Sequence, residues 1–207
     1  MGRPPRSLLT REGIMRAALE LVDEEGADAL STTRVAARLG VKGPSLYNYV
    51  AGRDEIIQGM FELIVAEMDL DPAVRPWTTA LATWARAYRA TFTAHPNAMP
   101  LLAARPAQSV AALQVYANAF AMLREAGFPE DRLLTVTMAL KQFVMGSTLA
   151  LEGHPLGTAP ADDLPPGLEP FLNPAPDFRE QVFETGLALL IRGFRDELDD
   201  LRAQQPS

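Results

Sequence analysis

Residues 30–54 read LSTTRVAARLGVKGPSLYNYVAGRD, and their order of small, glycine and branched side chains predicts a helix-turn-helix. Ala36 is small enough to stand where two helices touch, and Gly40 allows the sharp turn with positive φ four residues later. Val41 and Leu46 would close a small core beneath that turn. The same spacing suits other helical hairpins, so the residues around it decide the function.

Side chains around the predicted turn favour DNA binding over a plain helical hairpin. The second helix of the pair has a small or polar outward face, as a helix entering the major groove requires. That face consists of Gly43, Pro44, Ser45 and Asn48. Basic residues flank the helix at Lys42 and Arg53. Thr32 and Thr33 begin the preceding helix, where hydroxyl and backbone N–H groups can bind a phosphate.

Two tyrosines in the second helix allow two interpretations. Aromatic side chains on a helix of two turns often belong to the core, whereas a tyrosine on the outer face can reach the DNA backbone. Adjacent helical positions face different ways, so one of Tyr47 and Tyr49 can pack while the other contacts DNA. We favour Tyr47 for the DNA contact.

The charge distribution supports a nucleic-acid partner although the total charge does not. The net charge of −7 argues against nucleic acid. Residues 1–53, however, hold eight Lys/Arg and six Asp/Glu, a balance of +2, and the remainder holds 11 and 20, a balance of −9. Residues 31–53 contain four basic side chains and no acidic one. A basic segment on an acidic chain is typical of a DNA-binding domain joined to another domain.

Several residue types are scarce, and this limits the function. The chain has no cysteine and two histidines, His95 and His154, so we expect no metal site and no cofactor. No apolar run approaches a membrane span and no signal peptide begins the chain, so we expect a soluble cytoplasmic protein without a membrane partner. Glu152 with His154 is a weak catalytic pair, and we expect no enzyme.

Hydrophobic periodicity predicts an all-α fold without strands. Expected helices follow an N-cap at Thr10 up to Gly26, then cover 32–40, 43–51, 54–68, 77–94, 97–103, 107–126, 130–152 and 177–201. Residues 153–176 hold seven of the 17 prolines and are expected to form a loop. We expect a three-helix helix-turn-helix domain at 1–53, ordered from residue 10, and a larger helical ligand-binding and dimerisation domain at 54–207.

Residues 10–63 resemble the DNA-binding domain of the Tet repressor family of bacterial regulators, through AALELVDEEGADALSTTRVAARLGV and PSLYNYVAGRDEII. HPNAMPLLAARP, LREAGFPEDR and FVMGSTLALEGHP resemble the same family more loosely. The resemblance implies that the third helix reads bases through Gly43, Pro44, Ser45, Tyr47 and Asn48. It also implies positioning contacts from Thr32, Thr33, Arg34, Lys42, Tyr49 and Arg53. Gly43 departs from the family, where a base-contacting side chain is common, so Arg34 or the arm residues Arg3 and Arg6 would contribute.

An apolar stripe on the last helix suggests a dimer. It consists of Phe183, Leu187, Ile191, Phe194 and Leu198, spaced by three and four residues. Packing within one chain is the alternative. We favour a homodimer, because a single helix-turn-helix grips too few base pairs and palindromic operators mirror a two-fold protein. The family resemblance places the dimer contact on 130–152 and 177–201.

Aromatic and methionine side chains between these regions suggest a binding site for a small molecule. The expected ligand-binding residues are Trp84, Tyr88, Phe92, Leu102, Tyr116, Phe120, Met138, Gln142 and Met145. Ordinary core packing is the alternative for any one of them. His95, Asn97 and Gln142 are the polar groups near enough to orient a ligand, or else they cap helices or face solvent.

The resemblance implies a repressor released by a small inducer. Tetracycline-binding members place a histidine and a threonine, three apart, before an Arg-Pro pair, whereas Leu101 and Ala104 precede Arg105-Pro106 here. We therefore expect a largely apolar inducer instead of a metal–tetracycline complex. A transcriptional activator of the same fold is the main alternative, followed by a helical adaptor or an enzyme.

Overall fold

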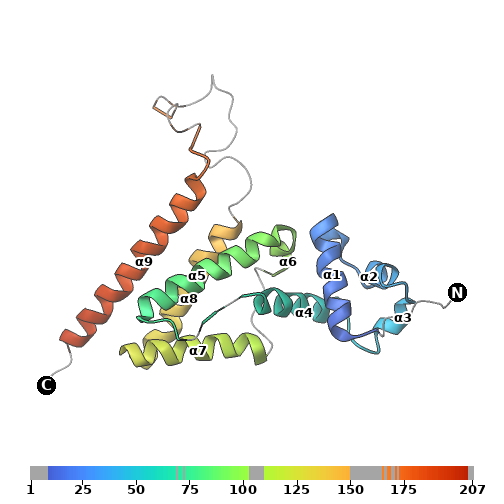
Figure 1. Cartoon of the computed structure of the whole chain (residues 1–207), viewed down its shortest axis with the longest axis horizontal. Coiled ribbons are helices and arrows are strands. Elements are labelled where there is room, and N and C mark those ends of the chain that lie inside the picture. Colours follow the sequence, from blue (N-terminus) through green and yellow to red (C-terminus); the bar gives the residue numbers. More distant parts are fainter. Residues whose placement is uncertain are drawn as a thin grey trace. The chain divides into compact units, whose positions relative to one another are not determined.

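The computed structural model describes residues 9–204, apart from 69, 72, 103–109, 150–164, 166, 169, 170 and 172. In this part of the chain the secondary structure is entirely helical, which confirms the all-α prediction (Figure 1). The elements are α1 (Arg11–Glu25), η1 (Ala27–Ala29), α2 (Thr32–Arg38), α3 (Gly43–Leu46), α4 (Arg53–Ala66), α5 (Trp77–Ala94), η2 (Pro96–Ala98), α6 (Met99–Leu102), α7 (Val110–Ala126), α8 (Glu130–Leu149) and α9 (Phe178–Ala203). None of the described helices is long and apolar enough to span a membrane.

Helix α1 begins and ends where its capping residues predict. The Thr10 side chain accepts a hydrogen bond from the Gly13 N–H at 3.0 Å, which satisfies one of the free donors of the first turn. Gly26 ends the helix with φ 88°, and its N–H donates to the Val22 carbonyl. These two local signals fix the ends of the helix that carries most of the N-terminal core.

Other helix boundaries agree with the periodicity except at α3. Helix α5 covers the predicted 77–94, and α9 extends the predicted 177–201 by two residues at its end. Helix α3 ends at Leu46 instead of 51. Residues 47–49 form turns, because the Tyr49 N–H donates to the Leu46 carbonyl only three residues back, and the buried Val50 follows them. Residues 103, 107–109 and 150–152, also predicted as helical, and most of the predicted loop lie outside the described residues.

The chain forms two compact units. The first contains residues 1–69 and 90–118, and the second contains residues 70–89 and 119–207. Helices α5 and α7 therefore contribute to both units. The functional division expected at residue 53 stays a prediction, since it concerns what each segment does and not how compact it is.

The first unit is organised by the contact between α1 and α4. At the start of α1, Arg11 donates hydrogen bonds to Glu55 at 3.1 Å and to Glu62 at 3.4 Å. Further along, Met15 packs against Gly59, where a Cβ atom would lie 2.5 Å from the methionine side chain. Only a residue without a side chain permits this approach of the two helices.

The second unit is organised by α8 and α9. The rings of Phe143 and Phe183 stack with centroids 5.6 Å apart. Gly186 makes this possible, because a Cβ atom there would lie 2.5 Å from the Phe143 ring. A glycine thus brings two helices together in each unit.

Gly59→Ala should destabilise the chain. The added methyl group must displace the buried Met15 side chain, and overpacking of a core costs about 1–3 kcal/mol. The free energy of unfolding is measured by urea denaturation, with Met15→Ala and the double variant completing a cycle. In the Met15→Ala background the same glycine substitution should be neutral or stabilising, because alanine has the higher helix propensity. An equal cost in both backgrounds would contradict the packing explanation.

Candidate functional site

The helix-turn-helix predicted from residues 30–54 is present in the first unit. Ala36 is buried in α2, and its carbonyl accepts a hydrogen bond from the Val41 N–H at 3.0 Å. Gly40 has φ 66°, the left-handed conformation that the turn was expected to need. Leu46 is fully buried in α3. The capping residue of α2, which the sequence analysis missed, is Ser31, whose hydroxyl accepts from the Arg34 N–H at 3.2 Å.

Both tyrosines of the predicted reading segment face solvent. Tyr47 is 58% exposed and Tyr49 is 43% exposed, so the alternative interpretation, that one of them packs in the core, is wrong. Leu46 and Val50 fill the core positions on either side of them. The remaining predicted contact residues are also at least partly accessible: Pro44, Asn48, Thr33, Arg34, Lys42 and Arg53 are exposed, and Thr32, Gly43 and Ser45 are half-buried.

Carboxylates of α1 neutralise part of the basic segment. Arg34 pairs with Glu25, and Arg38 donates to Glu24 at 2.7 and 2.5 Å and approaches Glu20 at 3.5 Å. The pKa of Glu24 is lowered by its hydrogen bond with Arg38. The acid-free stretch in the sequence is thus less positive in the folded unit than its composition suggests.

Lys42 and Arg53 hold the remaining positive charges beside α3. The Lys42 side chain has no hydrogen bond or ion pair with the described residues, and only its backbone carbonyl accepts a hydrogen bond, from the Ser45 N–H at 2.9 Å. The Arg53 Nε–H donates to the Leu30 carbonyl at 3.1 Å, which leaves the outer part of its guanidinium for another ligand. Lys42 is the simpler of the two to test, because removing it leaves the α2–α4 junction intact.

Glu55 connects α4 to α1 and to the turn that follows α3. Its carboxylate accepts hydrogen bonds from the Ala51 N–H at 2.7 Å and from Arg11 at 3.1 Å. The pKa of Glu55 is lowered, first by the backbone N–H of Ala51 and then by Arg11. An acidic residue in the first turn of α4 therefore fixes how the chain leaves the helix-turn-helix.

Some of the predicted ligand-binding residues come together in the second unit. The ring centroids of Trp84 and Tyr88 lie 5.0 Å apart, and the Tyr88 hydroxyl donates to the Met145 sulfur at 3.1 Å. Phe120 and Met138 are half-buried in the same unit, whereas Gln142 is exposed. Phe92, Leu102 and Tyr116 belong to the first unit, where the Phe92 ring lies 5.9 Å from Phe61. Their role in binding a ligand stays a prediction.

His95 and Asn97 bind other residues of the first unit. The His95 ring lies between two carboxylates, with Nδ1 2.7 Å from Asp23 and Nε2 3.2 Å from Glu67. The Asn97 amide donates to the backbone carbonyl of Asp23 at 2.8 Å. Asp23 and Glu67 were not singled out from the sequence, because nothing local signals that the ends of two helices meet the residue after α5.

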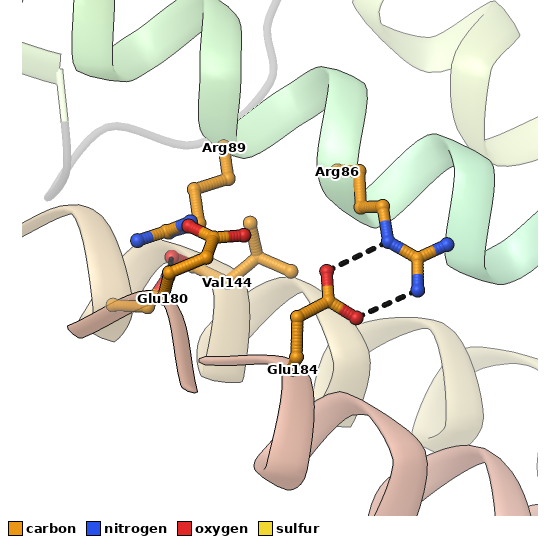
Figure 2. A network of polar contacts seen from close by, with 6 residues as sticks. Arg86, Arg89, Val144, Glu180 and Glu184 are labelled. Carbon is orange, nitrogen blue, oxygen red and sulfur yellow. Dashed lines mark hydrogen bonds and ion pairs between the residues drawn. The ribbon is translucent and has the colours of Figure 1, made fainter. Parts of the chain in front are cut away.

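Ion pairs connect α5 and α9 in the second unit (Figure 2). Arg86 donates two hydrogen bonds to Glu184, both at 2.7 Å, and this contact lowers the pKa of Glu184. Arg89 pairs with Glu180 and places its guanidinium 4.3 Å from the centroid of the Phe183 ring. Two arginines three residues apart on α5 thus pair with two glutamates four residues apart on α9.

The apolar stripe of α9 packs within the chain. Phe183, Leu187, Ile191, Phe194 and Leu198 are between 1% and 8% exposed. This burial accounts for the stripe without a partner chain, which was the alternative to a dimer contact. The other face of α9 carries Val182, 52% exposed, and Leu189, 58% exposed, seven residues apart and therefore on one side. A Cβ atom at Gly193 would meet open space.

Both parts of the chain match known bacterial regulators. The family model described as bacterial regulatory proteins, tetR family, matches residues 14–60, and the model described as tetracyclin repressor-like, C-terminal domain, matches residues 71–198. Tetracycline repressor protein class D from Escherichia coli is 30% identical over 203 residues, which cover 93% of this chain and 92% of that protein.

Two further relatives come from Streptomyces. HTH-type transcriptional repressor DrrR1 from Streptomyces coeruleorubidus is 29% identical over 70% of this chain, and the match spans 54% of that protein. The crystal structure of the TetR family protein ActR from Streptomyces coelicolor in complex with actinorhodin is 26% identical with a TM-score of 0.76. That likeness covers 90% of this chain and 95% of ActR.

Proposed function

The chain belongs to the TetR family of bacterial regulatory proteins, and on this basis we propose that it is a homodimeric transcriptional repressor of a palindromic operator, released by a small, largely apolar inducer. As a member of this family it is a transcriptional regulator and not an enzyme. The observation that carries the proposal is the exposed surface of α3 and the turn after it, built on a buried helix-turn-helix core. The cytoplasmic location goes with this proposal, because bacterial DNA lies there.

DNA binding is assigned to the accessible side of α2, α3 and the start of α4. Pro44, Ser45, Tyr47 and Asn48 face outward at least in part and would approach base edges in the major groove. Lys42, Arg53 and Tyr49 flank them and would contact phosphates. Gly43 offers no side chain for a base contact, so specificity would rest on few direct hydrogen bonds.

Dimerisation is assigned to the exposed side of α9. A partner chain gains little free energy by contacting side chains that are already buried within one chain. The side chains of the stripe from Phe183 to Leu198 are buried in this way. Val182 and Leu189 instead offer exposed apolar area, and Gly193 on the same side would let a second helix approach closely. Two reading helices joined in this way could occupy the half-sites of a palindrome.

The inducer is proposed to be an aromatic and largely apolar molecule. One relative is named as a tetracycline repressor, and the ActR structure is a complex with actinorhodin. Leu101 stands where tetracycline-binding members have a histidine, which argues against a metal–tetracycline complex. Trp84, Tyr88 and Met145, together in the second unit, offer aromatic and sulfur contacts of the kind that bind flat rings.

Release of DNA requires that the inducer prefers one conformation. A ligand that binds the non-operator conformation about a hundredfold better supplies roughly 2.7 kcal/mol of coupling. Helix α4 is the proposed mechanical link, because it follows the helix-turn-helix directly and is held to α1. An activator of the same fold is the alternative, and repression is favoured by the names of DrrR1 and the class D repressor.

Lys42→Ala should weaken binding to all DNA sequences and reduce the slope of log affinity against log salt by about one unit. The operator is first obtained by selecting bound duplexes from a random pool, and affinities are then measured by fluorescence anisotropy. Lys141→Ala, the same change at the chain's other lysine, on α8, is the matched control and should leave the slope unchanged. Selection of no sequence, or equal slopes for both variants, would count against DNA binding through α3.

Leu189→Glu should convert the dimer into a folded monomer, because it places a charge on exposed apolar surface without disturbing the core. Leu113→Glu, at a leucine of similar exposure on α7, should leave the dimer intact. Light scattering gives the mass, and circular dichroism checks that the helices persist. A parent protein with the mass of one chain, or a dimeric Leu189→Glu variant, would refute this assignment.

Inducer binding should quench the fluorescence of Trp84. In a Trp77→Phe background Trp84 is the only tryptophan, since the chain has two. Actinorhodin and a panel of apolar aromatic compounds are titrated, with tetracycline plus Mg²⁺ as the comparison. We expect quenching and operator release by a member of the aromatic panel and none by metal–tetracycline. The reverse pattern would show that the proposed ligand chemistry is wrong.

A further inference from the structure

His95 occupies the corner where α5 ends and η2 begins, and it connects three elements of the first unit. Its ring faces Asp23 in the last turn of α1 and Glu67 directly after α4. Asn97 adds a second connection to α1 through the carbonyl of Asp23. We call these four residues, Asp23, Glu67, His95 and Asn97, the His95 clasp.

The geometry of the clasp requires a charged imidazole. Both ring nitrogens face carboxylate oxygens, at 2.7 and 3.2 Å, and ionised carboxylates only accept hydrogen bonds. Neutral histidine has one N–H donor, whereas imidazolium has two. The second oxygen of Asp23, Oδ1, is buried and has no hydrogen-bond donor among the described residues, so His95 supplies the charge that compensates this carboxylate.

The surroundings of the ring agree with this geometry. The side chain is 14% exposed, and burial alone would lower the pKa of His95. Hydrogen bonds to Asp23 and then to Glu67 outweigh burial, so the pKa is raised above its ordinary value of 6.5. Among the described residues, Asp23 from α1 and Glu67 after α4 are the titratable groups that contact the ring. The element η2 contributes the neutral Asn97, and α6 has no charged residue.

The clasp lies beside the elements that position the DNA-binding helices. Helix α6 follows η2 without a gap and contacts α4, and η2 contacts α1. Helix α1 in turn packs against α2, whose arginines pair with α1 carboxylates. Holding α1 to the corner formed by η2 and α6 therefore restricts the movement of α1, and with it the movement of α2 and α3.

We propose that His95 is a positioning residue of this regulator: as imidazolium it holds α1 and the end of α4 to the η2–α6 corner, and operator affinity falls when the ring loses its proton. This inference rests on the proposed DNA binding. Loss of the clasp lets α1, α2 and α3 move more freely, and binding of the operator must then order these helices again at a cost in affinity. The contribution of the clasp is complete below about pH 6.5, the ordinary histidine pKa, and is lost as the pH rises through the raised pKa of the folded protein.

The first test measures the His95 ring without DNA. In the His154→Gln variant His95 is the only histidine, so its imidazole signals in an NMR pH titration are unambiguous. We expect a pKa above 6.5, which Asp23→Asn shifts downward because one acceptor is removed. A pKa at or below 6.5 would overturn the proposal whatever the protein does to DNA.

The second test measures the affinity for the selected operator between pH 6 and 9. The parent and the His154→Gln control should lose about tenfold more affinity over this range than His95→Gln, within the usual size of coupling between sites. His95→Lys keeps a positive charge across the range and should bind tightly with little pH dependence. Identical pH profiles for the parent and His95→Gln, or tighter parent binding at high pH, would refute the proposal. A parent that binds no selected duplex at any pH would instead refute the proposed function.

Discussion

The contact between α1 and α4 is the constraint on which the first unit depends. Arg11 reaches Glu55 and Glu62 at one end, and Met15 fills the space left by Gly59 in the middle. Because α1 also supplies carboxylates to the arginines of α2, the same helix contacts both α2, which precedes the reading segment, and α4, which follows it. A displacement of α4 along α1 must therefore break the packing of Met15 against Gly59 and the two ion pairs of Arg11 together, which favours two discrete arrangements over a continuous range.

Local signals predicted most helices correctly, because capping and periodicity act within a few residues. Thr10 and Gly26 mark the ends of α1, and the turn at Gly40 needs only its own backbone freedom. The end of α3 was wrong because it is decided by the burial of Val50, which depends on the rest of the core. The pairing of Arg34 with Glu25 and the position of the His95 ring depend on helices distant in sequence, so no local pattern could predict them.

Helix α9 shows the limit of an apolar stripe as a guide to assembly. Periodicity identifies which side of a helix is apolar, but it cannot distinguish a partner within the chain from one outside it. Here Phe183 and Leu187 are covered by the chain's own residues. Val182 and Leu189 are exposed, and the sequence does not single them out, because their side of the helix also carries alanine, threonine and arginine. Two isolated apolar residues seven apart on an otherwise polar face give a weak signal, and only the observed burial separates them from the core.

The paired charges of α5 and α9 have a consequence for how such a chain can diverge. Arg86 with Glu184, Arg89 with Glu180 and the stacked rings of Phe143 and Phe183 fix the register of α9 by side chains on the helices themselves. The alignment of α9 therefore does not require the segment that joins α8 to α9. Lengthening such a connection costs little, about 0.6 kcal/mol for each doubling of its length. Insertions and deletions between α8 and α9 are thus a route by which sequences can drift apart while the helix packing is inherited unchanged.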